Sequence, residues 1–587
     1  MTARAAPARV DATFAARLGR FGWLLAALGG LLAAAGTLLP WAHDPSFGGN
    51  LTYAFYPGGI QWWTLVLGVA TLVAAVLARP RPARGGTGGL QAWAGGAGRA
   101  AAVWGAVLAV LAVVEITTAL GGTVNVAAGC WVSVVGALLA LAGGRALPRS
   151  PAAGTQEADR PRQAGRRAPA AAGVAVVLLV VAVGLVAAVK LLDESDPVQF
   201  VAFGLFLGAA VTVLRRAGAV AWVGAQTQRF ATVFVLAGFA AAVVFPFTQN
   251  GSDANMSIAV QVLVFSAAAI GLNIVIGYAG LLDLGYIAFV GAGAYTSAIL
   301  SGSIFATVGW TPPFGVVMLL GALVSAVLGL IIGLPTLRLR GDYLAIVTLA
   351  FGEIFRITVN NLGGTNGPNV TGGPNGIAAI PGLDFGGFEF DTSHVLFGVT
   401  LGSFSNYYLL LLMLVGLIVF VVSRVSRVAR SRIGRGWVAI REDETAAEAM
   451  GINTYRLKLL AFSGGALLAG LGGTIKAHSD TSSVPDNYVF LYSSFLVAAI
   501  VLGGMGNIAG VILGSTILIL LPEKLRFFQD NRLLLFGLLL VLMMRFRPEG
   551  LLPSSRRRLE LHADGDAGEL GPAGALAQPR SNVGSAA

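Results

Sequence analysis

Two stretches of this chain concentrate the charged side chains that could take part in chemistry. In "REDETAAEAMG", residues 441–451, one arginine and four carboxylates fall within eight positions, and Asp283 stands alone in a Gly- and Tyr-rich stretch, residues 271–295. Carboxylates can serve as general acids, general bases or metal ligands. Neither stretch supplies a histidine or cysteine partner, because the chain has one cysteine, Cys130, and four dispersed histidines without an HExxH pair. We therefore expect no catalytic residue, no metal site and no cofactor in this chain.

The composition indicates a membrane protein. Hydrophobic residues make up 56% of the 587 residues and charged residues 11%, and the mean hydropathy is +0.77, whereas a soluble domain has about 25% charged residues. The apolar runs are continuous and do not alternate with polar residues, which predicts an all-α polytopic protein and not a β-barrel. About sixteen transmembrane helices are expected, each of roughly 20 residues: 21–40, 60–78, 101–120, 124–143, 171–192, 198–214, 229–248, 256–278, 283–302, 313–335, 343–361, 395–422, 456–476, 489–505, 508–522 and 532–546.

Basic residues orient these spans. The net charge is +11, and the arginines cluster in alternate connections, which is typical of cytoplasmic loops and argues against nucleic-acid binding. Both termini are then cytoplasmic, and four lysines beside 35 arginines are typical of a GC-rich bacterial genome, so a bacterial plasma membrane is expected. Five regions follow one another: accessory membrane helices (1–143), a basic Pro-rich cytoplasmic linker (144–170), further accessory helices (171–250), the main membrane region (251–552) and a disordered cytoplasmic tail (553–587).

Residues 442–451 are predicted to form a short helix outside the bilayer, on the cytoplasmic side. Glu442–Met450 contains no Pro or Gly and is rich in Ala and Glu, both strong helix formers. Gly451 suits the left-handed position after a helix, and Asn453 or Thr454 can cap the next one. Small side chains and one methionine make a low surface suited to another protein's groove. The alternative is a solvated connector between two spans.

Several motifs together resemble one family. "EDETAAEAMGIN" looks like the EAA loop of ABC-importer permeases, although the family's Glu-Ala-Ala, three residues, Gly pattern is compressed here to Glu448–Gly451. Segments 271–300, 337–357, 371–377 and 501–523 resemble the LivM-type permeases of branched-chain amino acid ABC importers, in family order within residues 256–552. The resemblance implies that the short helix couples the chain to a nucleotide-binding subunit, through Glu444, Ala446, Ala447, Glu448, Met450 and Gly451.

The resemblance also implies partners. No Gly is followed by Lys, so the chain lacks the GxxxxGK[ST] phosphate loop and two separate ABC ATPase subunits must supply the energy. A second related permease subunit and an extracytoplasmic solute-binding protein complete the expected complex, in which this chain is a transport subunit and not an enzyme. Urea and short amides are the competing substrates within the family. Outside it, the alternatives are a membrane scaffold or an ion-coupled secondary transporter, for which Asp283, Glu115 and Lys190 are the candidate charges.

Two segments are candidates for contact with the solute or its carrier. The glycines of 271–295 permit close packing or a helix break that frees backbone groups for a ligand. We interpret this stretch as lining the translocation path, through Asn273, Gly277, Tyr278, Asp283, Tyr286 and Tyr295; the alternative is plain packing, with Asp283 at the cytoplasmic membrane edge. The outer loop 360–382 is rich in turn-forming Gly, Asn and Pro. It is either a connector or a contact for the solute-binding protein, through Asn366, Gly367, Asn375 and Gly376.

Overall fold

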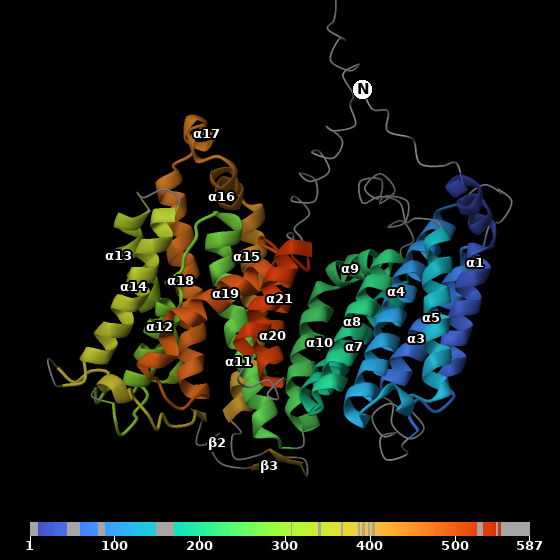
Figure 1. Ribbon diagram of the computed structural model, residues 1–587. Coiled ribbons are helices and arrows are strands. Elements are labelled where there is room, and N and C mark those ends of the chain that lie inside the picture. The colour runs from blue at the N-terminus through green and yellow to red at the C-terminus, as the bar shows by residue number, and fades with distance from the viewer. Residues whose placement is uncertain are drawn as a thin grey trace, which may run out of the picture. The chain divides into compact units, whose positions relative to one another are not determined.

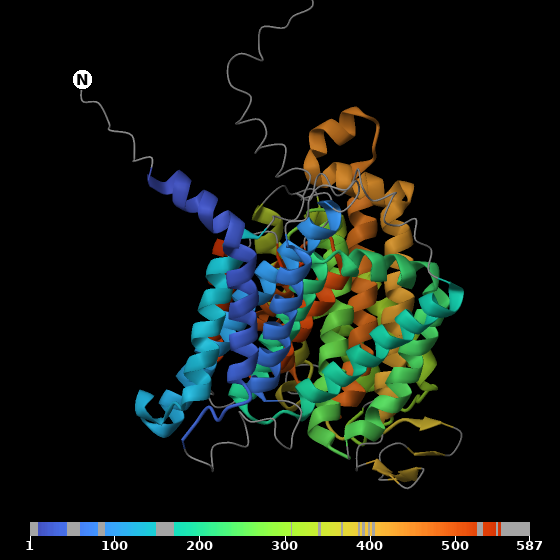
Figure 2. The ribbon, with the colours of Figure 1, turned by 90° about the vertical axis from the view of Figure 1, so that its right-hand side faces the viewer.

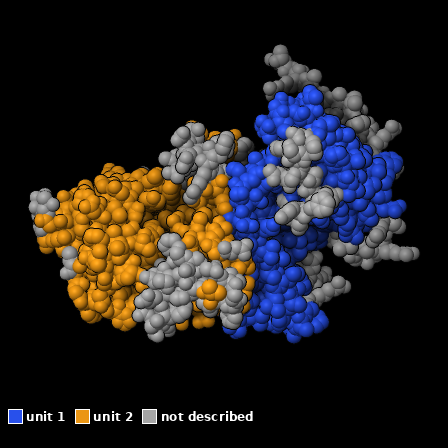
Figure 3. Space-filling model, turned by 90° about the horizontal axis from the view of Figure 1, so that it is seen from below, with its two compact units in different colours: residues 1–237 blue, residues 238–587 orange. Residues whose placement is uncertain are grey.

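The computed structural model describes residues 10–43, 59–79, 88–147, 169–249, 251–306, 308–337, 342–364, 368–385, 388–389, 394–396, 399–401, 406–524, 532–546 and 550–552. The chain forms two compact units, residues 1–237 (unit 1) and 238–587 (unit 2), which Figure 3 distinguishes by colour. Most of the predicted linker and the whole predicted tail lie outside the described residues.

The regular elements of unit 1 among its described residues are all helices. Its elements are α1 (Val10–Gly36), α3 (Ile60–Leu77), α4 (Gly88–Leu120), the 3-10 turn η2 (Thr123–Asn125), α5 (Ala128–Ala146), α7 (Ala170–Asp193), α8 (Pro197–Arg216) and α9 (Ala219–Arg229), and α10 (Ala231–Val244) crosses into unit 2 (Figure 1).

A seven-residue glycine repeat explains how α1 packs against α5. Glycines recur at positions 22, 29 and 36 of α1 and at 129, 136 and 143 of α5. A Cβ added to Gly29 would lie 2.2 Å from the Ala140 amide nitrogen, and one added to Gly136 would lie 2.3 Å from that of Ala33. The two backbones therefore touch along a glycine seam, the kind of contact by which small residues hold membrane helices together.

Unit 2 carries the segments that the sequence singles out. Its elements are the 3-10 turn η3 (Phe245–Gln249), α11 (Asp253–Asn273), the π-helical turn η4 (Ile274–Tyr278), α12 (Ile287–Ile299), α13 (Phe314–Thr336), α14 (Asp342–Asn361), the 3-10 turn η5 (Gly373–Asn375), strands β1 (Asp384–Phe385), β2 (Phe388–Glu389), β3 (His394–Leu396) and β4 (Val399–Leu401), α15 (Asn406–Arg430), α16 (Arg432–Glu442), α17 (Glu444–Ala449), α18 (Thr454–Ser479), the 3-10 turn η6 (Pro485–Tyr488), α19 (Phe490–Gly503), α20 (Ile508–Lys524) and α21 (Arg532–Phe546).

Helix α18 is the centre of unit 2. It packs along α11, α12 and α13, and its Phe462 meets Phe289 of α12 edge-on with ring centroids 5.6 Å apart. In both ribbon views α16 and α17 stand at one end of unit 2, and the short β hairpins stand at the opposite end (Figures 1 and 2). The unit thus presents its predicted coupling segment and its outer loops on opposite sides.

The helices confirm a polytopic α-helical membrane protein. Among the described residues, twelve helices are long and apolar enough to cross a membrane, and Phe21–Gly36 and Ile287–Ile299 are shorter apolar helices. The two hairpins, β1–β2 and β3–β4, are antiparallel and made of strands of two or three residues.

Two predicted boundaries were wrong. The span expected at 395–422 begins only at Asn406, because His394–Leu396 pairs with Val399–Leu401 as β3 and β4. The β-branched residues in both strands favour strand over helix. The same span was expected to end at 422, but α15 runs to Arg430 and α16 begins at Arg432.

Candidate functional site

The predicted path segment contains a break between α11 and α12. After Asn273 the chain makes one π-helical turn, residues 279–286 are not helical, and α12 has only 13 residues. At 1.5 Å per residue α12 is about 20 Å long, which is shorter than the hydrocarbon core of about 30 Å. The predicted continuous span at 283–302 is therefore wrong. Unit 2 holds a non-helical segment, 279–286, followed by a short helix, and many transporters place non-helical backbone of this kind beside a substrate.

The α11 side of this break is held by Asn273. Its side chain is fully buried, its Oδ1 accepts a hydrogen bond of 3.0 Å from the Gly506 amide, and its Nδ2 has no partner among the described residues. A Cβ on Gly277 would lie 2.1 Å from Asn273 Oδ1, so only glycine permits this approach. Tyr278, at the end of the π-helical turn, is partly exposed. The break is thereby joined to the turn between α19 and α20.

The non-helical segment 279–286 is organised by Asp283 and Tyr286. Asp283 is 1% exposed; its Oδ1 accepts from the Gly285 amide at 2.9 Å, and the Thr348 hydroxyl lies beside its carboxylate. The Tyr286 hydroxyl, also buried, donates to the Gly465 carbonyl of α18 at 2.6 Å. A carboxylate buried inside a membrane protein is costly and marks a candidate functional group.

Tyr295 lies apart from the other five predicted path residues. It is nine residues beyond Tyr286, about 13 Å along α12, and its ring packs against Tyr488 and Phe355 with centroids 5.8 and 6.5 Å away. The structure therefore brings Asn273, Gly277, Tyr278, Asp283 and Tyr286 together at the break and places Tyr295 in an aromatic cluster near the outer loops.

The predicted coupling helix is α17, and it begins two residues later than expected. Asp443 is its N-cap, with Oδ1 accepting from the Ala446 amide at 3.0 Å, while Glu442 ends the preceding helix α16. Gly451 follows the helix with φ +81°, and Asn453 caps α18 by accepting from the Arg456 amide at 3.0 Å. Both of these local predictions are confirmed.

The six predicted coupling residues divide into inward and outward groups. Ala447 is buried, Glu444 pairs with the buried Lys458 of α18, and Glu448 Oε1 accepts from the Thr454 hydroxyl at 2.7 Å. Ala446, Met450 and Gly451 are exposed, and Met450 is 82% exposed. The acids thus fasten α17 to α18, and the exposed surface consists of small residues and one methionine beside Glu448.

Helix α16 connects this segment to the break. Trp437 is buried and donates its indole N–H to the Leu457 carbonyl at 2.8 Å, which fixes α16 on α18. Arg441 donates from Nη1 to the Gly277 carbonyl at 2.9 Å and pairs with Glu442 through Nη2 at 2.6 Å. No local pattern predicts the contact between Arg441 and Gly277, because the two residues are 164 positions apart.

The outer loop is fastened to the segment after α18. Ile377 exchanges two backbone hydrogen bonds with Ser483, of 3.0 and 2.8 Å. Gly376 is buried with φ +65°, so it has a packing role, whereas Asn375 is exposed. The other two predicted contact residues, Asn366 and Gly367, lie outside the described residues.

Sequence reasoning missed Lys458 and Lys476. Both are among only four lysines in the chain, and Lys476 stands within an apolar span four residues before Asp480. That spacing is the signal that could have identified it, because residues four apart face each other on a helix. Within the described residues, no group of three or more His, Cys, Asp or Glu side chains could hold a metal ion.

Substitutions at the break have graded expected effects. Tyr286→Phe removes one hydroxyl and should lower the free energy of unfolding by about 1 kcal/mol, with uptake near that of the unmodified protein. Asp283→Ala leaves the Gly285 amide unpaired in the interior and should cost more, roughly 2 kcal/mol, with several-fold lower transport. Thermal unfolding of the purified protein and cellular uptake measure the two effects. Normal stability and transport in Asp283→Ala would refute an organising role for this carboxylate.

Comparison with known proteins identifies the family. The family described as "Branched-chain amino acid transport system / permease component" matches residues 254–544. The high-affinity branched-chain amino acid transport system permease protein LivM of Salmonella typhimurium is 40% identical over 346 residues, which cover 57% of this chain and 78% of that protein. LivM of Escherichia coli is 39% identical over the same shares, and BraD of Pseudomonas aeruginosa is 31% identical over 180 residues, 30% of this chain and 55% of that protein.

No solved structure matches this chain. The aligned region nevertheless includes 78% of each LivM protein. The residues that match the family contain the break, α16, α17 and α18. The chain belongs to the family of branched-chain amino acid transport permeases.

Proposed function

We propose that this chain is the transmembrane permease subunit of an ATP-driven importer of branched-chain amino acids. The observation that carries the proposal is the identity of 40% with a LivM permease over 346 residues. The structure adds an outward-facing helix, α17, whose own polar residues hold it on α18. An exposed apolar surface on such a short, braced helix fits insertion into a groove of a partner.

The mechanism that we propose is alternating access. ATP binding in the partner moves α17, and the movement reaches α18 directly and α11 through Arg441 and Gly277. Breaks in helices allow the two halves to move with little disturbance of the rest of the helix. The chain itself makes and breaks no covalent bond and needs no cofactor in this scheme.

The proposed complex contains two ABC ATPase subunits, a second related permease and an extracytoplasmic solute-binding protein. The ATPases dock on α17, and the binding protein meets the outer loop around Asn375. Residues 251–552 serve as the permease domain, with accessory helices at 1–143 and 171–250. Both termini are cytoplasmic in the bacterial plasma membrane. The count of about sixteen spans is reached when α1, α20, α21 and the non-helical segment with α12 are added to the twelve long helices.

The test is uptake of labelled leucine, with urea in parallel, in cells that lack this chain and in cells that express it again. Leucine uptake should be lost with the chain and return with it, and it should require ATP, whereas urea uptake should not change. Uptake of urea in place of leucine would move the substrate assignment to short amides. Uptake that persists without any ATPase subunit would refute the importer.

A further inference from the structure

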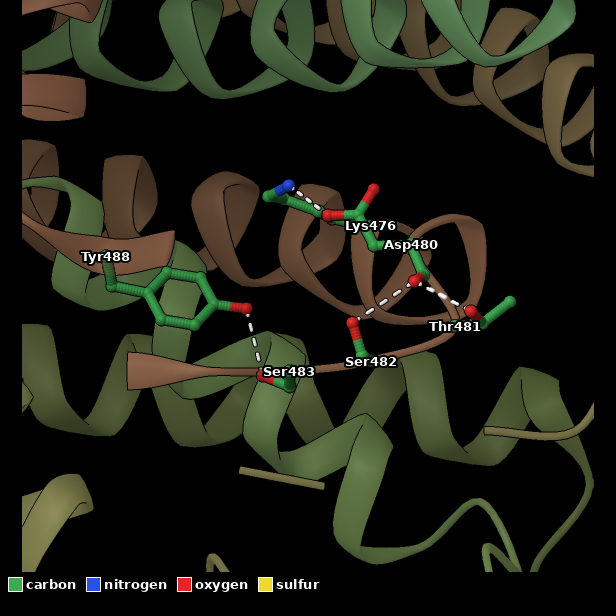
Figure 4. Close-up of polar contacts among 6 residues, drawn as sticks. All are labelled: Lys476, Asp480, Thr481, Ser482, Ser483 and Tyr488. Atoms are coloured by element: carbon green, nitrogen blue, oxygen red, sulfur yellow. Dashed lines mark hydrogen bonds and ion pairs between the residues drawn. The ribbon is translucent and has the colours of Figure 1, made fainter. Parts of the chain in front are cut away.

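An ion pair lies near the end of α18 that is remote from α17. Lys476 and Asp480 are one helical turn apart, their side chains are 13% and 20% exposed, and the ammonium contacts Asp480 Oδ2 (Figure 4). Lys476 is about 33 Å along the helix from Thr454, at the level of the outer loops. Charges inside a membrane-spanning helix are costly and usually mark a functional site.

The backbone after the pair is fixed by hydroxyl groups. The side chains of Thr481 and Ser482 both donate to the Asp480 carbonyl, at 2.8 and 3.2 Å, and Ser483 Oγ lies 3.0 Å from the Tyr488 hydroxyl (Figure 4). The carboxylate is thus carried on a braced turn. An ion pair between exposed, flexible side chains contributes little to stability, whereas the Asp480 carboxylate is held in place by the turn that carries it.

Lys476 also borders a narrow apolar gap between four helices. The space not occupied by atoms in and around this gap is about 180 Å³, open solvent included, and none of it is wide enough for a water molecule. The gap is therefore too narrow for a ligand in this conformation. Lys476 is the one charged residue that borders it, and its ammonium is held by Asp480. The other lining residues are Val264, Phe265 and Ala268 of α11, Ile287 and Val290 of α12 and Leu496 of α19.

We propose that Lys476, Asp480 and this gap form a recognition site for a zwitterionic α-amino acid with an aliphatic side chain. The ligand's carboxylate binds Lys476, its ammonium binds Asp480, and its branched side chain occupies the gap once the helices separate. The inference rests on the proposed function and assigns residues to it.

Charge balance supports this ligand class. The ion pair is neutral as a whole, and so is a zwitterion, so replacing one internal pair by two ligand pairs leaves no buried charge without a partner. A simple carboxylic acid would leave Asp480 uncompensated, and a simple amine would leave Lys476 uncompensated, so each is disfavoured. The apolar walls reject polar side chains for the same reason.

The coupling segment reaches two of the helices that enclose the gap. Helix α18 follows directly after α17, and Arg441 binds Gly277 at the far end of α11. A relative shift of α11 and α18 would therefore open or close the space beside Lys476. The site is placed where movement of α17 can control it.

The test measures leucine uptake by cells that express the full importer. Its permease chain is either the wild type or one of three variants: Lys476→Met, Asp480→Asn, and the double variant Lys476→Met/Asp480→Leu. Each variant should lower the maximal uptake rate by about tenfold or more, because each removes a charged partner of the ligand. The double variant should keep the thermal stability of the wild type, since apolar replacement of both partners leaves no unpaired charge. ATPase subunits should still co-purify with all three.

The matched control is the ion pair of α14, Glu353 and Arg356, which is 2.9 Å long and does not line the gap. Glu353→Leu/Arg356→Met should keep near-normal uptake. Restored uptake in the double variant of Lys476 and Asp480 would overturn the proposal and leave a purely structural ion pair. If that variant does not reach the membrane, normal uptake by the isosteric Asp480→Asn decides against the proposal. Absence of leucine uptake by the wild-type importer would instead refute the proposed function.

Discussion

Met450→Asp is expected to abolish transport without unfolding the chain. Met450 is 82% exposed at the end of α17, so in the free subunit a charge there meets water and should change stability by only about 0.5–1 kcal/mol. In the assembled importer the same side chain would be buried against the ATPase. An unpaired buried charge costs several kcal/mol, enough to reduce subunit binding by roughly a hundredfold or more.

Three measurements check this expectation: co-purification of the ATPase subunits, leucine uptake, and thermal unfolding of the purified subunit. Co-purification and leucine uptake should be lost, and the thermal unfolding temperature should stay near that of the wild type. Met450→Leu is the matched control, because it keeps an apolar side chain of similar volume and should dock and transport normally. Normal co-purification of Met450→Asp would mean that the ATPase docks elsewhere on the chain.

The sequence predicts those parts of this fold that depend on neighbouring residues. The predicted span 60–78 is close to α3 (Ile60–Leu77), and 456–476 lies within α18 (Thr454–Ser479), because continuous apolar runs identify membrane helices directly. The left-handed Gly451 and the Asn453 cap are equally local. The span at 395–422 failed for the opposite reason: composition there is apolar, but strand pairing, which composition does not reveal, takes residues 394–401.

The candidate site shows where local reasoning stops. Glycines and Asp283 indicate that something interrupts α11, yet the chain's own pattern cannot tell that the Asn273 side chain binds Gly506, 233 residues away. Nor does it show that two acids of the predicted docking surface, Glu444 and Glu448, bind side chains of α18. Contacts between distant segments determine which polar side chains have a structural partner and which remain available to bind a ligand or another subunit.

Arg441→Met is expected to uncouple ATP hydrolysis from transport. Arg441 is the one residue of α16 and α17 for which a hydrogen bond to the segment after α11 is seen among the described residues. Methionine keeps the apolar stem over Gly280, where Arg441 Cγ would lie 2.6 Å from an added Cβ, but it leaves the Gly277 carbonyl without this donor. The outward surface of α17 is untouched, so ATPase subunits should still bind and hydrolyse ATP.

The expected loss is in the transmission of that energy. A coupling free energy between two sites is typically about 1–3 kcal/mol, so leucine uptake per ATP hydrolysed should fall by roughly tenfold. Arg441→Lys keeps a charged donor but loses the forked guanidinium, so its uptake per ATP should lie between that of the wild type and that of Arg441→Met. Arg456→Met is the matched control, since Arg456 is exposed at the first turn of α18 and should leave the ratio unchanged. If hydrolysis and uptake in Arg441→Met decline together, Arg441 anchors the assembled ATPase and does not transmit its movement. If uptake alone declines, the path from α17 to the break runs through this guanidinium.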